Sequence, residues 1–292
     1  METGEVRIED WIGRTECIRD RIGAERVQAL QATLDRVQPL LQEGDPLPPL
    51  WHWLYFWTIV PRSGLGRDGH PALGGFLPPV GTARRMWAGS RVRFPGDLAL
   101  GDWAERRSTI ADVVSKTGRS GRLVFVTVRH EIVGPAGPAI VDEHDIVYRE
   151  ERGAGAAARP GTAAPSGAAW SEEVRPDPVM LFRYSALTFN GHRIHYDRDY
   201  ATTVEGYSGL VVHGPLLATL MIGLAVRSWP ARTIAGFEFR GHRPILDTAP
   251  FTVAAAPAGE DALDLWIADA NGWLAMKGRA DFVSLPKRRV SE

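Results

Sequence analysis

Residues 212–229 read Val-His-Gly-Pro-Leu-Leu-Ala-Thr-Leu-Met-Ile-Gly-Leu-Ala-Val-Arg-Ser-Trp, and this stretch decides the fold. Proline suits the first turn of a helix, so a helix is predicted from Pro215, and Pro230 predicts its end. The helix is apolar on nearly all sides, so other structure has to surround it. Its apolar run, residues 216–226, is shorter than the roughly 20 residues that cross a bilayer. We therefore predict a buried helix in a globular domain.

Runs of β-branched and apolar residues on both sides of this helix predict an antiparallel sheet. After the helix, strands are expected at residues 232–239, 251–256, 263–269 and 273–282, with a hairpin turn at Ala270-Asn-Gly272. Before it, strands are expected at residues 91–94, 103–114, 123–132, 139–148 and 180–189. Apolar residues at helical spacing predict an earlier helix over residues 20–41. A helix accompanied by strands in each half is an α+β pattern.

The segment 151–170 is rich in Ala, Gly and Pro and contains few large apolar residues, so it predicts a flexible linker. We therefore divide the chain into a first domain at residues 1–150, a linker at residues 151–176 and a second domain at residues 177–292. A chain of 292 residues is long enough for two domains of ordinary size.

Charge and cysteine content exclude several classes of protein. The net charge of −1 favours neither a nucleic-acid partner nor an anionic membrane surface. The single cysteine, Cys17, excludes an internal disulfide and a cysteine metal cluster, and we expect it to be a small buried side chain. The polar, acidic start of the chain is unlike a signal peptide. These features predict a cytoplasmic protein with neither a nucleic-acid nor a membrane partner.

Two short motifs of the second half carry the chemistry. They are Thr188-Phe-Asn-Gly-His-Arg-Ile-His195 and Val212-His-Gly214. Together they resemble the signature of the MaoC-like hydratases and dehydratases, in which a Gly-Asp-x-Asn-Pro-Ile-His loop precedes a His-Gly pair at the start of a central helix. The sequence departs from that signature because Asn190 stands where many members carry a catalytic aspartate, and because His192 and Arg193 replace Asn-Pro.

The first half is similar to the degenerate N-terminal domain of two-domain members, such as mitochondrial-type hydroxyacyl-thioester dehydratases and mesaconyl-/itaconyl-CoA hydratases. The segments that carry this likeness are Pro48-Pro-Leu-Trp-His-Trp-Leu54, Gly74-Gly-Phe-Leu-Pro-Pro79, Arg84-Arg-Met-Trp87 and Val128-Arg-His-Glu131. The resemblance implies a double hotdog, each half a long central helix wrapped by a curved antiparallel sheet, with the catalytic domain second. It also implies a lyase, an acyl-CoA hydratase/dehydratase that acts on a short branched or dicarboxylic acyl group of the itaconyl or mesaconyl type.

Hydration of an enoyl thioester needs a base for water, a stabiliser for the enolate oxygen and a proton for Cα. His195 is the expected base, because an imidazole titrates near neutral pH; His192 is the second choice. Asn190 is expected to fix the water or the imidazole, although a turn-forming role is as well supported. The Gly214 N–H, at the positive end of the helix, is expected to bind the thioester oxygen.

Substrate binding is assigned to His213, which either orients the thioester or packs, and to arginines, which pair with phosphates and carboxylates. The arginine candidates are Arg84, Arg85, Arg183 and Arg193, with Arg240 and Arg243 as further choices. No metal site and no cofactor are predicted, since the chemistry needs only the CoA thioester substrate.

Three alternatives are weighed against the acyl-CoA hydratase. A 3-hydroxyacyl-ACP dehydratase differs only in the carrier. A non-catalytic acyl-thioester binder is suggested by Asn190 in place of an acid. A hotdog thioesterase is disfavoured, because residues 215–229 contain no Asp or Glu. A homodimer is expected only by analogy, since a double hotdog already pairs two units.

Overall fold

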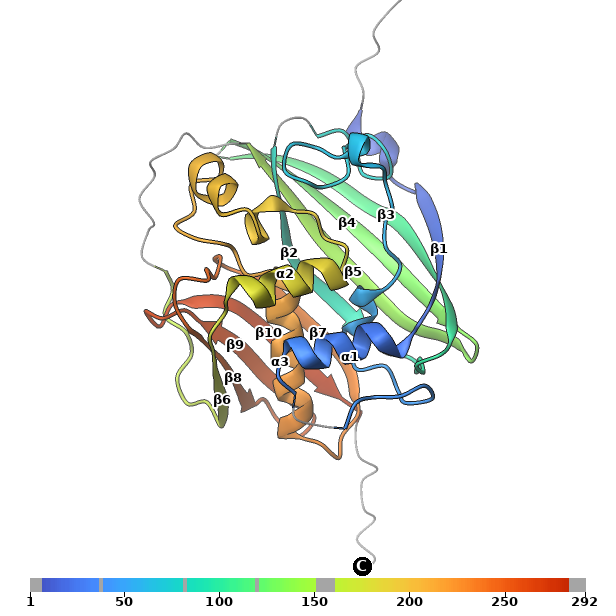
Figure 1. The fold of residues 1–292 in the computed structure, drawn as a ribbon, viewed down its shortest axis with the longest axis vertical. Coiled ribbons are helices and arrows are strands. Elements are labelled where there is room, and N and C mark those ends of the chain that lie inside the picture. The colour runs from blue at the N-terminus through green and yellow to red at the C-terminus, as the bar shows by residue number, and fades with distance from the viewer. Residues whose placement is uncertain (1–6, 37–38, 81–82, 119–120, 151–160, 284–292) are drawn as a thin grey trace, which may run out of the picture.

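The computed structural model describes residues 7–36, 39–80, 83–118, 121–150 and 161–283 (Figure 1). The first half contributes strands β1 (Thr15–Arg21), β2 (Ala83–Arg93), β3 (Trp103–Gly118), β4 (Gly121–Gly134) and β5 (Gly137–Glu150). The second half contributes β6 (Trp170–Val174), β7 (Ile234–Gly241), β8 (Phe251–Pro257), β9 (Ala262–Ala268) and β10 (Leu274–Phe282). The strands form one sheet in the order β1-β3-β4-β5-β2-β7-β10-β9-β8-β6, and the paired neighbours are antiparallel. The predicted α+β class is confirmed.

The two halves join where β2 pairs with β7, in a register from Gly89↔Arg240 to Arg93↔Gly236. A Cβ at Gly89 would lie 2.2 Å from the carbonyl oxygen of Phe239, so the close approach of the strands requires glycine there. The pairing of β2 with β5 shifts register between Trp87 and Gly89. The sheet is therefore continuous across the junction of the two halves, and the register shift of β2 lies close to this junction.

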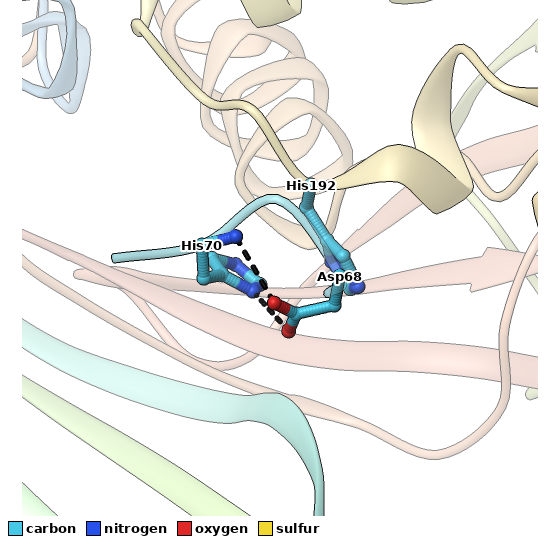
Figure 2. Close-up of side chains that lie close together, drawn as sticks. All are labelled: Asp68, His70 and His192. Atoms are coloured by element: carbon cyan, nitrogen blue, oxygen red, sulfur yellow. Dashed lines mark hydrogen bonds and ion pairs between the residues drawn. The ribbon is translucent and has the colours of Figure 1, made fainter. Parts of the chain in front are cut away.

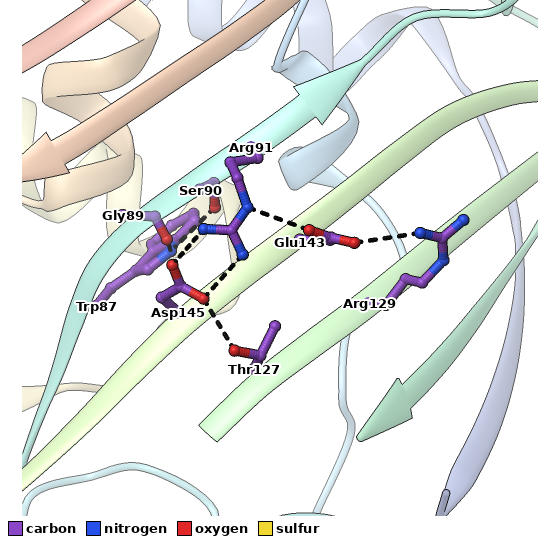
Figure 3. Close-up of polar contacts among 8 residues, drawn as sticks. All are labelled: Trp87, Gly89, Ser90, Arg91, Thr127, Arg129, Glu143 and Asp145. Carbon is purple, nitrogen blue, oxygen red and sulfur yellow. Dashed lines mark hydrogen bonds and ion pairs between the residues drawn. The ribbon is translucent and has the colours of Figure 1, made fainter. Parts of the chain in front are cut away.

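Charged side chains form a ladder across β2, β5 and β4 (Figure 3). Arg91 donates to Asp145 at 2.6 Å and to Glu143 at 3.1 Å, and Arg129 donates to Glu143 at 3.1 Å. Asp145 also accepts from the hydroxyl of Thr127 at 3.0 Å. Exposed pairs of this kind each contribute roughly 0–1 kcal/mol, but directly opposed unlike charges favour this register over a slipped one.

Helix α3 (Gly214–Ser228) is the buried helix predicted from residues 212–229. It packs against β7, β8, β9 and β10, and against β6 at the edge. Where it crosses β10, a Cβ at Gly278 would lie 2.7 Å from Cε of Met221, so the helix approaches the sheet over a glycine. The strands predicted after the helix match β7 to β10 to within two residues at either end.

The helix of the first half is shorter than the predicted 20–41. Residues up to Arg21 belong to the edge strand β1, and α1 runs from Ala24 to Thr33. Gly23 caps its start in an extended conformation, and Asp35, with φ +47°, turns the chain away from the helix just after its end. Helix α1 packs against α2 (Pro178–Leu187), beside which it lies in Figure 1.

Helix α2 replaces the strand predicted at residues 180–189, and that prediction is wrong. Asp177 caps the helix, since its Oδ1 accepts the N–H of Met180 at 2.8 Å, and Pro178 occupies the first turn. The Asp-Pro pair is a helix-start signal that the apolar run after it obscured. Because α2 ends at Leu187, the motif Thr188–His195 follows directly from the C-terminal end of this helix.

Two other expectations need correction. Within the predicted linker 151–176, residues 151–160 lie outside the described residues, but Trp170–Val174 is strand β6 and pairs with β8. Cys17 is exposed on the edge strand β1 rather than buried. Among the helices of the described ranges, none is both long and apolar enough to cross a membrane.

Candidate active site

A cavity of about 1760 Å³ lies between the two halves of the chain. The first half contributes loop residues between 52 and 77 and side chains of β2, β4 and β5, and the second half contributes residues 185–196 and the start of α3. Part of the tryptophan-rich segment after Pro49, including Trp53 and Trp57, forms an apolar wall. The cavity is large enough for a thioester group with a short acyl chain.

His195 lies on this cavity, in a 3-10 turn that runs from Arg193. Its Nδ1 is 2.7 Å from the carbonyl oxygen of Val211. A carbonyl only accepts hydrogen bonds, so Nδ1 carries the hydrogen and Nε2 of the neutral ring keeps its lone pair. Burial lowers the pKa of His195 to about 4, although the hydrogen bond to Val211 acts in the opposite direction. At neutral pH the ring is therefore a neutral base with fixed orientation.

His213 packs directly against His195. The two rings are stacked, with centroids 3.7 Å apart and an interplanar angle of 19°. His213 is fully buried, does not line the cavity, and its Nε2 lies 2.8 Å from Oγ of Ser185. Burial, with the charges of His195 and His192, holds its pKa well below the usual value. Two roles are weighed for His213, orienting the thioester and packing. Its buried position away from the cavity favours packing over the predicted contact with the substrate.

Asn190 lines the cavity, but its side chain also shapes the motif loop. Its Oδ1 accepts the backbone N–H of His192 at 2.9 Å, and its own backbone N–H is bonded to the carbonyl of Ser185 at 2.8 Å. The preceding Phe189 adopts a left-handed φ of +51° and stacks on Trp57 with centroids 5.0 Å apart. The side chain of Asn190 thus shapes the turn of the motif loop, which is one of the two roles weighed for it.

Gly214 is the first residue of α3 and lines the cavity. An N–H in the first turn of a helix has no acceptor within that helix. A Cβ built at Gly214 would have no atom within 4 Å, so the space in front of this residue is open. The N-terminal end of α3 is therefore accessible from the cavity at its positive pole.

The predicted arginines divide into two groups. Arg85, Arg240 and Arg243 line the cavity. Arg193 instead pairs with Asp197 through Nη2 at 2.7 Å and lies over the ring of Tyr200, and Arg183 is exposed on α2; neither lines the cavity. The substrate-binding roles predicted for Arg193 and Arg183 are therefore corrected. The side chain of Arg84 lies outside the described part of the structure.

Two residues that no sequence motif indicated, Asp68 and His70, also line the cavity. Figure 2 shows them beside His192. Oδ2 of Asp68 is 2.8 Å from Nδ1 of His70, and the rings of His70 and His192 have centroids 4.2 Å apart. The ring of His192 in turn meets His195 edge-on at 5.2 Å. Three imidazoles and a carboxylate thus converge at one end of the cavity.

Ligand-type atoms of Asp68, His70 and His192 all lie within 4.8 Å of one another, a separation at which they could hold a metal ion. Two observations weigh against assigning them as ligands. Asp68 and His70 are already hydrogen-bonded to each other, and the positive charge of Arg85 acts on both His70 and His192. The geometry is therefore that of a polar cluster in which a carboxylate orients one imidazole and a second imidazole contacts it.

A second buried polar group lines the cavity in the first half. Oδ2 of Asp142 accepts from Trp53 at 2.8 Å and lies 2.7 Å from Nε2 of His144 and 3.2 Å from Nε2 of His52. Burial alone would raise the pKa of Asp142, but the charges and hydrogen bonds of His144 and His52 outweigh it and hold this pKa well below the usual value. Since Asp142 is already bonded by three neighbours, this group is suited to fixing the wall of the cavity.

Comparisons with known proteins identify relatives of the chain. The sequence model of hydroxyacyl-thioester dehydratase type 2 matches residues 50–247. The chain is 47% identical over 271 residues to the mesaconyl-C(4)-CoA hydratase of Chloroflexus aurantiacus, covering 93% of this chain and 96% of that protein. It is 27% identical over 285 residues to the mitochondrial hydroxyacyl-thioester dehydratase type 2 of Schizosaccharomyces pombe, covering 86% and 91% of the two chains.

Solved structures show the same fold. A MaoC-like dehydratase from Phytophthora capsici superposes with a TM-score of 0.70 at 12% identity, covering 96% of this chain and 98% of that one. A Mycobacterium tuberculosis protein described as a double hotdog superposes with a TM-score of 0.58 at 14% identity, covering 94% and 96%. The predicted double hotdog is thereby confirmed.

Proposed function

The chain belongs to the hydroxyacyl-thioester dehydratase type 2 family, and from this premise we propose that it adds water to, and removes it from, a short dicarboxylic or branched acyl-CoA of the mesaconyl or itaconyl type. The chain is an acyl-thioester hydro-lyase, and the acyl group is the part proposed. The observation that carries the proposal is the neutral His195, fixed by Val211, on a cavity that also receives the start of α3.

Each part of the reaction has a suitable group. Nε2 of His195 takes a proton from water, whose oxygen then attacks Cβ of the enoyl thioester. Negative charge moves to the thioester oxygen, where the N–H of Gly214 and the N-terminal end of α3 stabilise it; a donor of this kind is worth about 100- to 1,000-fold in rate. A low pKa keeps His195 in its base form at neutral pH, at the cost of weaker basicity.

The proposed acyl group is supported by the 47% identity to a mesaconyl-C(4)-CoA hydratase and by positive charge on the cavity wall. Arg85, Arg240 and Arg243 line the cavity and offer partners for a free carboxylate or for the phosphates of CoA. A monocarboxylic substrate of the same length would leave such an arginine without its partner, which selects against it.

The remaining expectations stay proposals. We propose that no cofactor is needed, because addition of water to an activated double bond is acid–base chemistry alone. Cytoplasmic location and association into a homodimer stay predictions, which fractionation of cells and analytical ultracentrifugation would measure.

A panel of thioesters tests the function. Mesaconyl-C4-CoA and itaconyl-CoA are compared with crotonyl-CoA, which lacks the second carboxylate, and with an enoyl-ACP. Loss of the conjugated absorbance and gain of the mass of one water are measured for the wild type and for Arg183→Gln, whose changed side chain lies away from the cavity. We expect both to hydrate a dicarboxylic CoA ester fastest. Preference for the ACP ester would support the alternative of a 3-hydroxyacyl-ACP dehydratase, and binding without turnover would support a non-catalytic acyl-thioester binder.

A further inference from the structure

We propose that His70, held by Asp68, is the second catalytic proton carrier of this site and exchanges the proton at Cα while His195 serves the oxygen at Cβ. The inference rests on the proposed function. It assigns to the loop of residues 66–70 of the first half a catalytic role in a site whose motif lies in the second half.

The chemistry calls for a second carrier, because water addition removes one proton from the water that attacks Cβ and adds one proton to Cα. Asn190 occupies the place of the acid in the motif and cannot accept a proton at neutral pH. Its Oδ1 is moreover engaged with the N–H of His192. A titratable group therefore has to come from elsewhere on the cavity, within reach of the same substrate.

The Asp68–His70 pair has the geometry of an oriented base. Nδ1 of His70 lies 2.8 Å from Oδ2 of Asp68, and the backbone N–H of His70 donates to Oδ1 at 3.1 Å. An ionised carboxylate only accepts, so Nδ1 carries the hydrogen and Nε2 is left for the substrate. Burial would raise the pKa of Asp68, but the hydrogen bond and charge of His70 outweigh it, so the carboxylate stays ionised.

The loop is fixed against the catalytic motif by direct backbone contact. Gly69, with φ +90°, lies so close to Gly191 that a Cβ on Gly69 would be 1.9 Å from the Gly191 carbonyl oxygen. The carbonyl of Asp68 accepts the N–H of Arg193 at 2.8 Å, and that of Arg67 accepts from Nη1 of the same arginine at 3.3 Å. His70 is therefore held at a constant position relative to His195.

The steps balance in the dehydration direction. Nε2 of neutral His70 takes the proton from Cα, the electron pair of that bond forms the double bond, and the Cβ–O bond breaks as protonated His195 gives its proton to the departing hydroxyl. The products are the enoyl thioester, water, protonated His70 and neutral His195. The proton then returns to His195, and the ring of His192, in contact with both, lies on the path.

The pH dependence has a defined sign. The active form holds one proton shared by His70 and His195, so the rate falls when both are protonated and when neither is. Burial lowers the pKa of His70, Asp68 raises it, and Arg85 lowers it; the His192 ring also faces it. In Asp68→Asn the raising influence is lost, so the alkaline limb of kcat/KM should move to lower pH.

The test uses His70→Asn, which keeps an N–H for Asp68 but lacks Nε2. Dehydration of the hydroxyacyl-CoA is measured with hydrogen or deuterium at Cα. We expect kcat to fall about 100- to 10,000-fold, KM to change little, and the isotope effect on kcat to rise because breaking of the Cα bond becomes slowest. Gly69→Ala should also lower kcat, whereas Gly259→Ala, at φ +96° with no atom within 4 Å of its Cβ, should not.

Each other outcome is decisive. Turnover of His70→Asn within threefold of the wild type, or an unchanged isotope effect, overturns the inference while the proposed function stands. A wild type that turns over no thioester overturns both. Activity that is lost on dialysis against a chelator and restored by Zn²⁺ would replace the proton carrier with a metal site made by the same three side chains.

Discussion

Gly214→Ala should leave the fold intact or more stable and yet impair catalysis. The added Cβ meets no atom within 4 Å, and alanine is favoured over glycine in a helix by up to about 1 kcal/mol. The Cα–Cβ bond of a helical residue tilts toward the N-terminus, which at Gly214 is the end of α3 that lies on the cavity. The methyl group would therefore occupy the place proposed for the thioester oxygen.

The N–H of residue 214 remains in the variant, but the methyl group keeps the oxygen from it, so the expected size of the effect is that of losing the contact with one donor. We predict a decrease in kcat/KM of about 100- to 1,000-fold, or about 3–4 kcal/mol of transition-state stabilisation. Gly223→Ala in the same helix is the matched control, because its Cβ would meet the ends of two flexible side chains, Arg227 at 3.2 Å and Arg36 at 3.9 Å. Steady-state kinetics and thermal melts of both variants are compared. If Gly214→Ala is stable and as active as the wild type, the amide of Gly214 does not bind the reacting oxygen.

Three further predictions concern the histidines. His195→Asn, which keeps a donor for Val211 but has no Nε2, should lower kcat about 100- to 10,000-fold at an unchanged Kd for a substrate analogue, and a smaller loss would assign the base elsewhere. The pKa of His195 is about 4 in the folded state against about 6.5 in the unfolded chain, so between these pH values only the unfolded chain binds the proton. The free energy of unfolding should therefore fall by up to about 3 kcal/mol as the pH drops from 6.5 to 4. A denaturation midpoint that does not change over this pH range would contradict the burial of His195. Ser185→Ala removes the hydroxyl that is hydrogen-bonded to His213, whose Nδ1 already has no partner among the described residues. The free energy of unfolding, measured with urea, should fall by about 1–3 kcal/mol. No change would mean that water reaches the ring.

The parts of the fold marked by a long apolar run or by a clear turn signal could be predicted from the sequence. The apolar run that ends before Pro230 predicted α3, and the turn signal at Ala270-Asn-Gly272 predicted the hairpin that joins β9 and β10. Short apolar segments could not be assigned in this way. In residues 180–189 the apolar content is that of a strand, and the Asp177 cap alone distinguishes the helix.

The motif proposed to be catalytic could be located from the sequence, but the residues proposed as its partners could not. His195 and Gly214 are close in the chain and come from one pattern, and both line the cavity. Asp68 and His70 lie in a distant loop whose position depends on the contact between Gly69 and Gly191, and neither glycine signals that contact by itself. The position of a long side chain is hardest to predict from the sequence. Arg193, for example, forms an ion pair with the neighbouring Asp197 and does not line the cavity.

The most direct measurement is the reaction of a dicarboxylic enoyl-CoA in water enriched in ¹⁸O, with mass spectrometry of the products from the wild type and from His195→Asn. If His195 activates water for attack at Cβ, the wild type forms an intact CoA ester that is heavier by one labelled water, with the label in the new hydroxyl, and the variant forms it at a small fraction of that rate. Release of free CoA with label in the carboxylate, or equal labelling by the variant, would contradict the account.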